Sequence, residues 1–180
     1  MTTIKETINE TIEELSKCDN NIPFFTFDKE THLSRIVKCY DGDTFHCIFK
    51  HNGKYQKFHI RLYQYDSAEM KPSKQDPIRD QQIEKANEAK KKLEEYILNK
   101  NVYLYLRGFD KYGRILAEIK LTENDQKTIN QLMIDGVYGY EYYGGTKKEK
   151  IATNSNIKSV NNKPKRKQKI KIDTNVDLKI

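Results

Sequence analysis

Three short segments of this chain carry the residues whose types and spacing could do chemistry. They are residues 41–44 (DGDT), residues 61–69 (RLYQYDSAE) and residues 110–114 (DKYGR). The first two hold four carboxylates, and four carboxylates that converge cannot all stay ionised without a counter-charge. A hard divalent cation with oxygen ligands is the usual counter-charge. Arg61 and Arg114 would face that cation, and such an arrangement indicates a phosphodiester substrate.

The elements that must position these segments are strands and turns. Runs rich in β-branched and aromatic residues lie at 35–40, 44–50 and 55–63. Asp41-Gly42 and Asn52-Gly53 separate them, and such pairs are strong short-range signals for a hairpin turn. Three antiparallel strands joined by tight turns form a meander.

Helices and two further strands complete the pattern. Residues 66–76 are expected to form a loop, and Asp76 to cap a helix that has Pro77 at its first position and ends near residue 98. Strands follow at 102–106 and 114–121. Thr128 with Gln131 forms a capping box for a short helix that stops at Gly136.

This order of elements predicts a β-rich α+β fold, a five-stranded OB-type Greek-key barrel with flanking helices. A closed barrel has no free strand edges, and its strand ends converge at the rim. Residues 43, 61, 66–69 and 114 all lie at or near predicted strand ends. The barrel therefore allows the three segments to meet in one place.

The same segments carry a resemblance to a known family. The stretch from residue 33 to residue 143 resembles the staphylococcal nuclease (thermonuclease) family through the three motifs, which occur in the family's order. Residues 130–136 (NQLMIDG) resemble the family's second barrel-flanking helix. The resemblance implies a Ca²⁺-dependent, sugar-non-specific endonuclease that hydrolyses phosphodiester bonds of DNA and RNA. Its products would carry a 3′-phosphate and a 5′-hydroxyl.

The resemblance also implies a role for each residue of the site. The metal ligands would be the carboxylates of Asp43 and Asp66 and the backbone carbonyl of Ser67, with Asp41 and Glu69 reaching the cation through water. The catalytic residues would be Arg61 and Arg114, which grip the phosphate, and Glu69, which activates the attacking water. Terminal-phosphate contacts would come from Lys111, Tyr112 and Tyr142. Ser67-Ala68 departs from the Thr-Pro that is common in the family, which leaves this loop less stiff.

Other interpretations of these residues stay open. Asp41 and Asp43 could simply be turn residues, and residues 110–114 a plain hairpin turn. Arg61 and Asp66 could form a surface ion pair, and Glu69 could be a solvated loop charge. The alternative function is a catalytically inactive OB-fold module that binds single-stranded nucleic acid, on tyrosine stacking platforms, or a protein partner. Convergent acids favour the enzyme, because they would repel phosphate in a binding groove.

The 180 residues are predicted to divide into three parts: an N-terminal helix and linker (1–31), the OB-fold domain (32–145) and a basic, disordered tail (146–180). The net charge of +7 belongs to the tail, which holds 11 basic and 3 acidic residues. Its segment 163–169 (KPKRKQK) has three interpretations: an anchor for polyanions, a nuclear-import signal, and a tail that aids solubility. The helix at 3–17 has one apolar stripe, and three interpretations stay open: it packs on the domain, it frays in solution, or it binds a partner or a second copy of the chain.

Composition excludes several classes of protein. No apolar run approaches the roughly 20 residues needed to cross a bilayer, and the N-terminus has no apolar stretch of signal-peptide type. We therefore expect a cytoplasmic or nuclear protein, and a monomer. The three cysteines make neither a disulfide framework nor a zinc site. A two-residue turn at Asp41-Gly42 would place Cys39 opposite Thr44 and Cys47 opposite Ile36.

Overall fold

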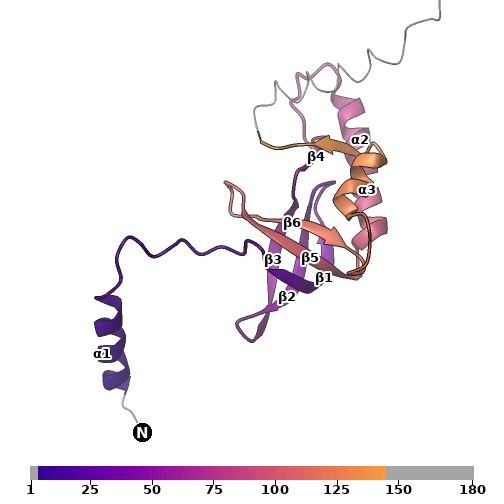
Figure 1. Ribbon diagram of the computed structural model, residues 1–180. Helices are drawn as coiled ribbons and strands as arrows, with labels where there is room; N and C mark the ends of the chain where they lie inside the picture. Colours follow the sequence, from indigo (N-terminus) through magenta and orange to yellow (C-terminus); the bar gives the residue numbers. More distant parts are fainter. Residues whose placement is uncertain (1–3, 145–180) are drawn as a thin grey trace, which may run out of the picture. The chain divides into compact units, whose positions relative to one another are not determined.

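Five strands close into a barrel in the order β1-β2-β3-β6-β5 (Figure 1). The structure is a computed structural model and describes residues 4–144. The barrel strands are β1 (Thr31–Cys39), β2 (Thr44–His51), β3 (Lys54–Leu62), β5 (Asn101–Phe109) and β6 (Ile115–Lys120). Neighbours pair antiparallel except β3 and β6, which are parallel. The predicted five-stranded OB-type barrel is confirmed.

The barrel is flanked by helices and by a small second sheet. The helix α2 (Arg79–Ile97) follows β4 (Tyr65–Ser67), and α3 (Ile129–Asp135) precedes β7 (Gly139–Glu141). β4 and β7 pair antiparallel as a two-stranded sheet. Figure 1 shows α2 and α3 side by side, and residues of the two helices are in contact.

The core follows from the periodicity of each element. Inward positions of a strand recur every second residue, so β5 buries Val102, Leu104 and Leu106, and β6 buries Ile115, Ala117 and Ile119. Helical positions that share one face recur every three or four residues. The face of α2 that packs on this core is formed by Ala86, Ala89, Leu93 and Ile97.

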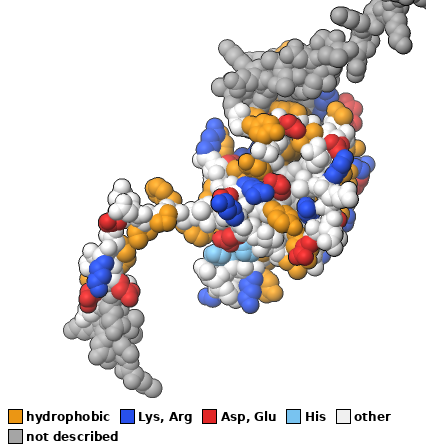
Figure 2. All heavy atoms as spheres, viewed as in Figure 1, with side chains coloured by type: hydrophobic (Ala, Val, Ile, Leu, Met, Phe, Trp, Pro, Cys, Tyr) orange, Lys and Arg blue, Asp and Glu red, His pale blue; other side chains and the backbone are white. Residues whose placement is uncertain are grey.

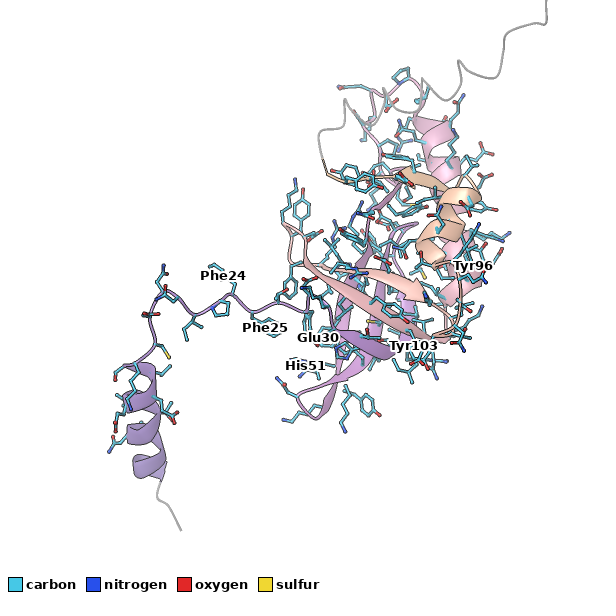
Figure 3. All side chains as sticks on the ribbon, in the orientation of Figure 1. Phe24, Phe25, Glu30, His51, Tyr96 and Tyr103 are labelled. Carbon is cyan, nitrogen blue, oxygen red and sulfur yellow. The ribbon has the colours of Figure 1, made fainter. Side chains whose placement is uncertain are left out.

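Aromatic rings fill the barrel at the end where β2 and β3 turn. Phe27, which precedes β1, is 4% exposed and packs edge-on against Phe49, Phe58 and His51 at centroid distances of 5.1–6.1 Å. Phe49 and Phe58 stack at 4.0 Å. Figure 3 shows His51 and Glu30 at this end, below Phe25. The chain just before β1 thus contributes to the core.

The hairpin between β1 and β2 differs from the prediction. Ile36 lies opposite Cys47 as expected, but Cys39 lies opposite Phe45 and not Thr44. The register shifts by one residue between Ile36 and Lys38. Because of that irregularity, four residues connect the strands in place of a two-residue turn. Cys39 and Cys47 are free, buried thiols, and burial raises the pKa of each to about 12.

Two other local predictions were wrong, and one was confirmed. Ile78, not Asp76, is the N-cap of α2, because the Asp76 carboxylate accepts from the Ile78 amide in a turn before the helix. The expected loop at 66–76 begins with β4, which is too short to show an alternating pattern. The predicted cap of α3 at Thr128 is confirmed, since its side chain accepts from the Gln131 amide, while the Gln131 side chain donates to Asp135.

The N-terminal helix α1 (Ile4–Leu15) has the predicted extent to within a few residues. Its apolar side chains Ile8, Ile12 and Leu15 are exposed. The described part of the chain contains no helix long and apolar enough to cross a membrane. The predicted basic tail lies outside the described residues. On the face in Figure 2, basic and acidic side chains are interspersed over the barrel.

Candidate functional site

Arg61, near the end of β3, lies between two buried carboxylates. Its Nη1 is 2.5 Å from Asp43 Oδ2, and its Nη2 is 2.5 Å from Asp66 Oδ1. Nη2 also donates to the Tyr65 carbonyl at 3.2 Å. Asp43 is 4% exposed and Asp66 8%. A buried carboxylate without a partner would be strongly destabilising, so one guanidinium supplies the counter-charge for both acids.

The second arginine reaches the same place through a hydroxyl. Arg114 Nη1 donates to Thr44 Oγ1 at 3.2 Å, and Thr44 Oγ1 donates to Asp43 Oδ1 at 2.7 Å. The other guanidinium nitrogens of Arg114, Nε and Nη2, each lie 2.7 Å from Asp110 Oδ2. Arg61 therefore contacts Asp43 directly, and Arg114 contacts it through Thr44.

Strand pairing explains why these side chains meet. The antiparallel register of β2 and β3 places Thr44 opposite Arg61. The parallel register of β3 and β6 places Arg61 beside Leu116, so Arg114 lies just before the paired part of β6. The ends of β2, β3 and β6 thus bring together residues from positions 43, 61 and 114, as the closed barrel predicts.

The turn at 41–43 packs closely on α2 and β4. Its Asp41 Oδ1 accepts from the Asp43 amide at 3.0 Å, which fixes the turn. A Cβ at Gly42 would lie 2.7 Å from the Ala89 Cβ and 2.9 Å from the Ser67 Cβ. Only glycine allows this approach without a shift of the neighbours. Asp41 and Ser67 are therefore drawn to the end of the barrel where Asp43 lies.

The pairing of β4 with β7 adds a residue that sequence reasoning missed. Asp66 lies opposite Tyr140 in the register, and the Tyr140 hydroxyl donates to Asp66 Oδ2 at 2.7 Å. The alternation Tyr138, Tyr140, Tyr142 has the period of a strand and is the one local signal that could have indicated β7, although it does not specify the pairing with β4. The amide of Tyr142 donates to the Gln64 carbonyl at 3.2 Å. The predicted phosphate contact of Tyr142 stays a prediction.

The other predicted residues lie on loops at this end. Glu69 lies two residues beyond β4, and its side chain is exposed. Lys111 and Tyr112 are exposed on the turn between β5 and β6. The Lys111 Nζ lies 4.9 Å and the Arg114 guanidinium carbon 5.5 Å from the Tyr112 ring centroid, within the range of cation–π contact. The roles of these loop residues stay predictions.

Burial and charge shift the acid–base properties of the site. Burial raises the pKa of Asp43 to about 7, while the charge of Arg61 acts in the opposite direction and that of Asp41 adds to the rise. Burial opposes the charge of Arg61, but the two carboxylates outweigh it and raise the guanidinium pKa further. A cation beside Asp43 would favour its ionised form.

The donors at this site suit a hard cation. Within residues 4–144, no three His, Cys, Asp or Glu side chains are grouped to hold a metal ion. The carboxylates of Asp43 and Asp66 have about four lone-pair sites each, and Arg61, Thr44 and Tyr140 use only some of them. The Tyr65 hydroxyl is buried with no hydrogen-bond partner among the described residues. The carboxylates and the hydroxyl are oxygen donors, which Ca²⁺ prefers, often together with water.

Two comparisons with known proteins bear on the family of this chain. Residues 59–170 match the family model described as staphylococcal nuclease homologue. The matched stretch contains Arg61, Asp66 and Arg114, while Asp43 precedes it. The chain is also similar to a protein of Haemophilus influenzae (strain ATCC 51907 / DSM 11121 / KW20 / Rd) described as an "Uncharacterized endonuclease".

The two sequences are 32% identical over 91 residues, which is 51% of this chain and 43% of the relative. The chain therefore spans less than half the length of that relative. The family model, by contrast, matches more than half of this chain, and the barrel with its flanking helices is the fold that the resemblance implied. The chain belongs to the staphylococcal nuclease homologue family.

Proposed function

We propose that this chain is a Ca²⁺-dependent nuclease that hydrolyses phosphodiester bonds in DNA and RNA without selecting for the sugar. One observation carries the proposal: Asp43, Arg61 and Asp66 form one buried ion-paired cluster, and Arg114 joins it through Thr44. Membership of the family and the name of the relative support nuclease activity.

The carboxylates of Asp43 and Asp66 and the carbonyl of Ser67 would hold the cation, with Asp41 acting through water. When bound, Ca²⁺ would cancel phosphate charge and help to orient the attacking water. Oxygen donors in a partly hydrated, flexible arrangement match its preference. The Asp41 side chain already holds the turn that carries Asp43, so Asp41 also positions a ligand.

The two arginines would bind the phosphate. A guanidinium presents parallel donors whose spacing fits two oxygens of a phosphate as well as those of a carboxylate. Arg61 already spans two carboxylates, and Arg114 is held by Asp110 on its other side. Such fixed donors stabilise the extra negative charge of the five-coordinate transition state.

Glu69 would accept the proton of the attacking water as the new P–O bond forms. The bond from phosphorus to the 5′ oxygen would break, and that oxygen would take up a proton from solvent water. The products are a 3′-phosphate and a 5′-hydroxyl. Lys111, Tyr112 and Tyr142 would contact a terminal phosphate. Lys111 and Tyr112 lie exposed on the β5–β6 turn, as contact with a large polymer requires.

A digestion experiment tests the proposal against an inactive binding module. Plasmid DNA, single-stranded DNA and RNA are incubated with the full chain, once with Ca²⁺ and once with a chelator, and the product ends are analysed. We expect cleavage of all three substrates, loss of cleavage with chelator, and 3′-phosphate ends. Binding of single strands without chelator-sensitive cleavage would support the inactive module and refute the nuclease.

A further inference from the structure

The β4–β7 sheet holds two buried or half-buried tyrosines beside Asp66, and one of them, Tyr140, hydrogen-bonds to its carboxylate. Tyr65 and Asp66 are consecutive residues of β4, and Tyr140 pairs with Asp66 from β7. Gly139, beside Tyr140, lies so close to the Tyr65 ring that a Cβ there would be 2.5 Å from Tyr65 Cζ. The backbone of β7 is therefore packed directly on the Tyr65 ring.

Tyr140 supplies a donor to the second oxygen of the Asp66 carboxylate. Arg61 binds Oδ1 of this carboxylate, and the Tyr140 hydroxyl binds Oδ2 at 2.7 Å. With a donor on each oxygen, the carboxylate plane is fixed. Partners that fix the orientation of a metal-binding carboxylate typically affect metal affinity by about 10–100-fold.

Tyr65 differs from Tyr140 because its buried hydroxyl is not paired within the part of the chain that the structure describes. The residue is 0% exposed, and its hydroxyl has no hydrogen-bond partner among the described residues. An unpaired buried hydroxyl destabilises a protein, whereas phenylalanine fills nearly the same volume without that cost. The Tyr65 ring lies against Gly139, the residue before Tyr140, and burial, then the charges of Asp43 and Asp66, raise its pKa. Within residues 4–144, the Tyr65 hydroxyl is therefore an unused donor beside the strand pair that holds Asp66.

We propose that Tyr65 and Tyr140 are positioning residues of the cation site. Tyr140 orients Asp66, and the Tyr65 hydroxyl hydrogen-bonds to an oxygen in the shell of the bound cation. The inference rests on the proposed function, because it requires that Asp43 and Asp66 bind a cation.

Terbium luminescence tests the inference without an activity assay. Tb³⁺ occupies oxygen-rich Ca²⁺ sites and emits when a nearby aromatic ring transfers excitation energy to it. The chain has no tryptophan, so its 12 tyrosines are the donors. The full chain is titrated with Tb³⁺ under tyrosine excitation, and Ca²⁺ is used to displace the probe. Tyr65→Phe and Tyr140→Phe are compared with Tyr55→Phe, an 81% exposed tyrosine at the far end of β3.

We expect Tyr140→Phe to weaken Ca²⁺ binding about tenfold. Tyr65→Phe should also weaken it, while the melting temperature of the cation-free protein stays the same or rises because the unpaired hydroxyl is gone. Both variants should give weaker sensitised emission at saturating Tb³⁺, and Tyr55→Phe should match the wild type. Wild-type affinity and emission in both variants would overturn the inference. Absence of displaceable Tb³⁺ binding in the wild type would instead overturn the proposed function.

Discussion

At the scale of single residues, one guanidinium balances two acids. Arg61 binds Asp43 and Asp66 at once, and both are nearly excluded from solvent. The sequence predicted these three residues because motif order and strand ends pointed to one rim. It did not predict Tyr140 or Tyr65, since their contribution depends on the pairing of two three-residue strands, which no local pattern specifies.

Conservative replacement of the arginines tests their role in phosphate binding. Lysine keeps the charge but loses the two-pronged donor geometry. We expect Arg61→Lys and Arg114→Lys to lower the cleavage rate about 10²–10³-fold while the fold survives, measured by initial rates and circular dichroism. Arg107→Lys is the control, because Arg107 pairs with Glu118 outside the cluster. An Arg61→Lys variant with wild-type rate would refute the assignment.

The pair of Asp110 and Arg114 predicts a pH dependence of stability. Burial alone would raise the pKa of Asp110, but hydrogen bonds from Arg114 and the Tyr112 amide outweigh it and hold the pKa below its ordinary value. A lowered pKa means that the ionised form stabilises the fold above the unfolded value, and that this contribution is lost as the pH falls through the folded value. We expect Asp110→Asn to melt earlier than wild type at neutral pH. The difference in melting temperature between the two proteins should shrink in acid. A difference that does not change with pH would contradict the pairing of Asp110 with Arg114.

At the scale of elements, the turn before β2 is placed by tertiary contacts. The two-residue hairpin suggested by Asp41-Gly42 does not form, because β1 changes register before the turn and the turn packs on α2 and β4. Local preference was therefore overruled by packing. The N-terminus of α2 shows the same limit, since Asp76 hydrogen-bonds one turn before the helix begins.

Gly42→Ala tests whether that close packing holds the site together. The new Cβ would overlap Ala89 and Ser67, and we expect a loss of about 1–3 kcal/mol in the free energy of unfolding together with weaker Ca²⁺ binding. Gly53→Ala is a matched control, because Gly53 has φ of +77° in open space and its replacement costs about 1–2 kcal/mol. The control should lose stability but keep Ca²⁺ affinity. If Gly42→Ala binds Ca²⁺ as tightly as Gly53→Ala does, the turn does not position Asp43.

At the scale of the whole molecule, alternation and helical periodicity were sufficient to predict the barrel. Long strands such as β5 and the buried face of α2 repeat their apolar positions often enough to be recognised. The two-stranded sheet of β4 and β7 was not, because three residues carry too little pattern. The sequence therefore predicted the barrel and that Asp43, Arg61 and Arg114 meet at its rim, and missed the sheet that supports Asp66.

The charge distribution leads to a prediction about nucleic-acid binding. Residues 1–145 hold 22 basic and 23 acidic residues, so the surplus lies in residues 146–180. If the tail binds phosphates, replacing Lys165, Arg166 and Lys167 with glutamine makes the dependence on salt shallower. The negative slope of log affinity against log salt loses about 0.7–0.9 in magnitude for each phosphate that is no longer neutralised. The measurement is fluorescence anisotropy of labelled DNA with chelator present, and the melting temperature is the control. An unchanged slope would exclude this segment as an anchor.

Calorimetric titration with Ca²⁺ tests most directly whether Asp43 and Asp66 form a cation site at the barrel rim. We expect binding at one site in the full chain and its loss in Asp43→Asn and Asp66→Asn, with melting curves confirming that each variant is folded. Asp80→Asn, at an exposed acid of α2, is the control and should leave Ca²⁺ binding unchanged. The cation site would be contradicted if the wild-type chain gave no heat of binding. It would also be contradicted if folded Asp43→Asn and Asp66→Asn chains bound Ca²⁺ as the wild type does.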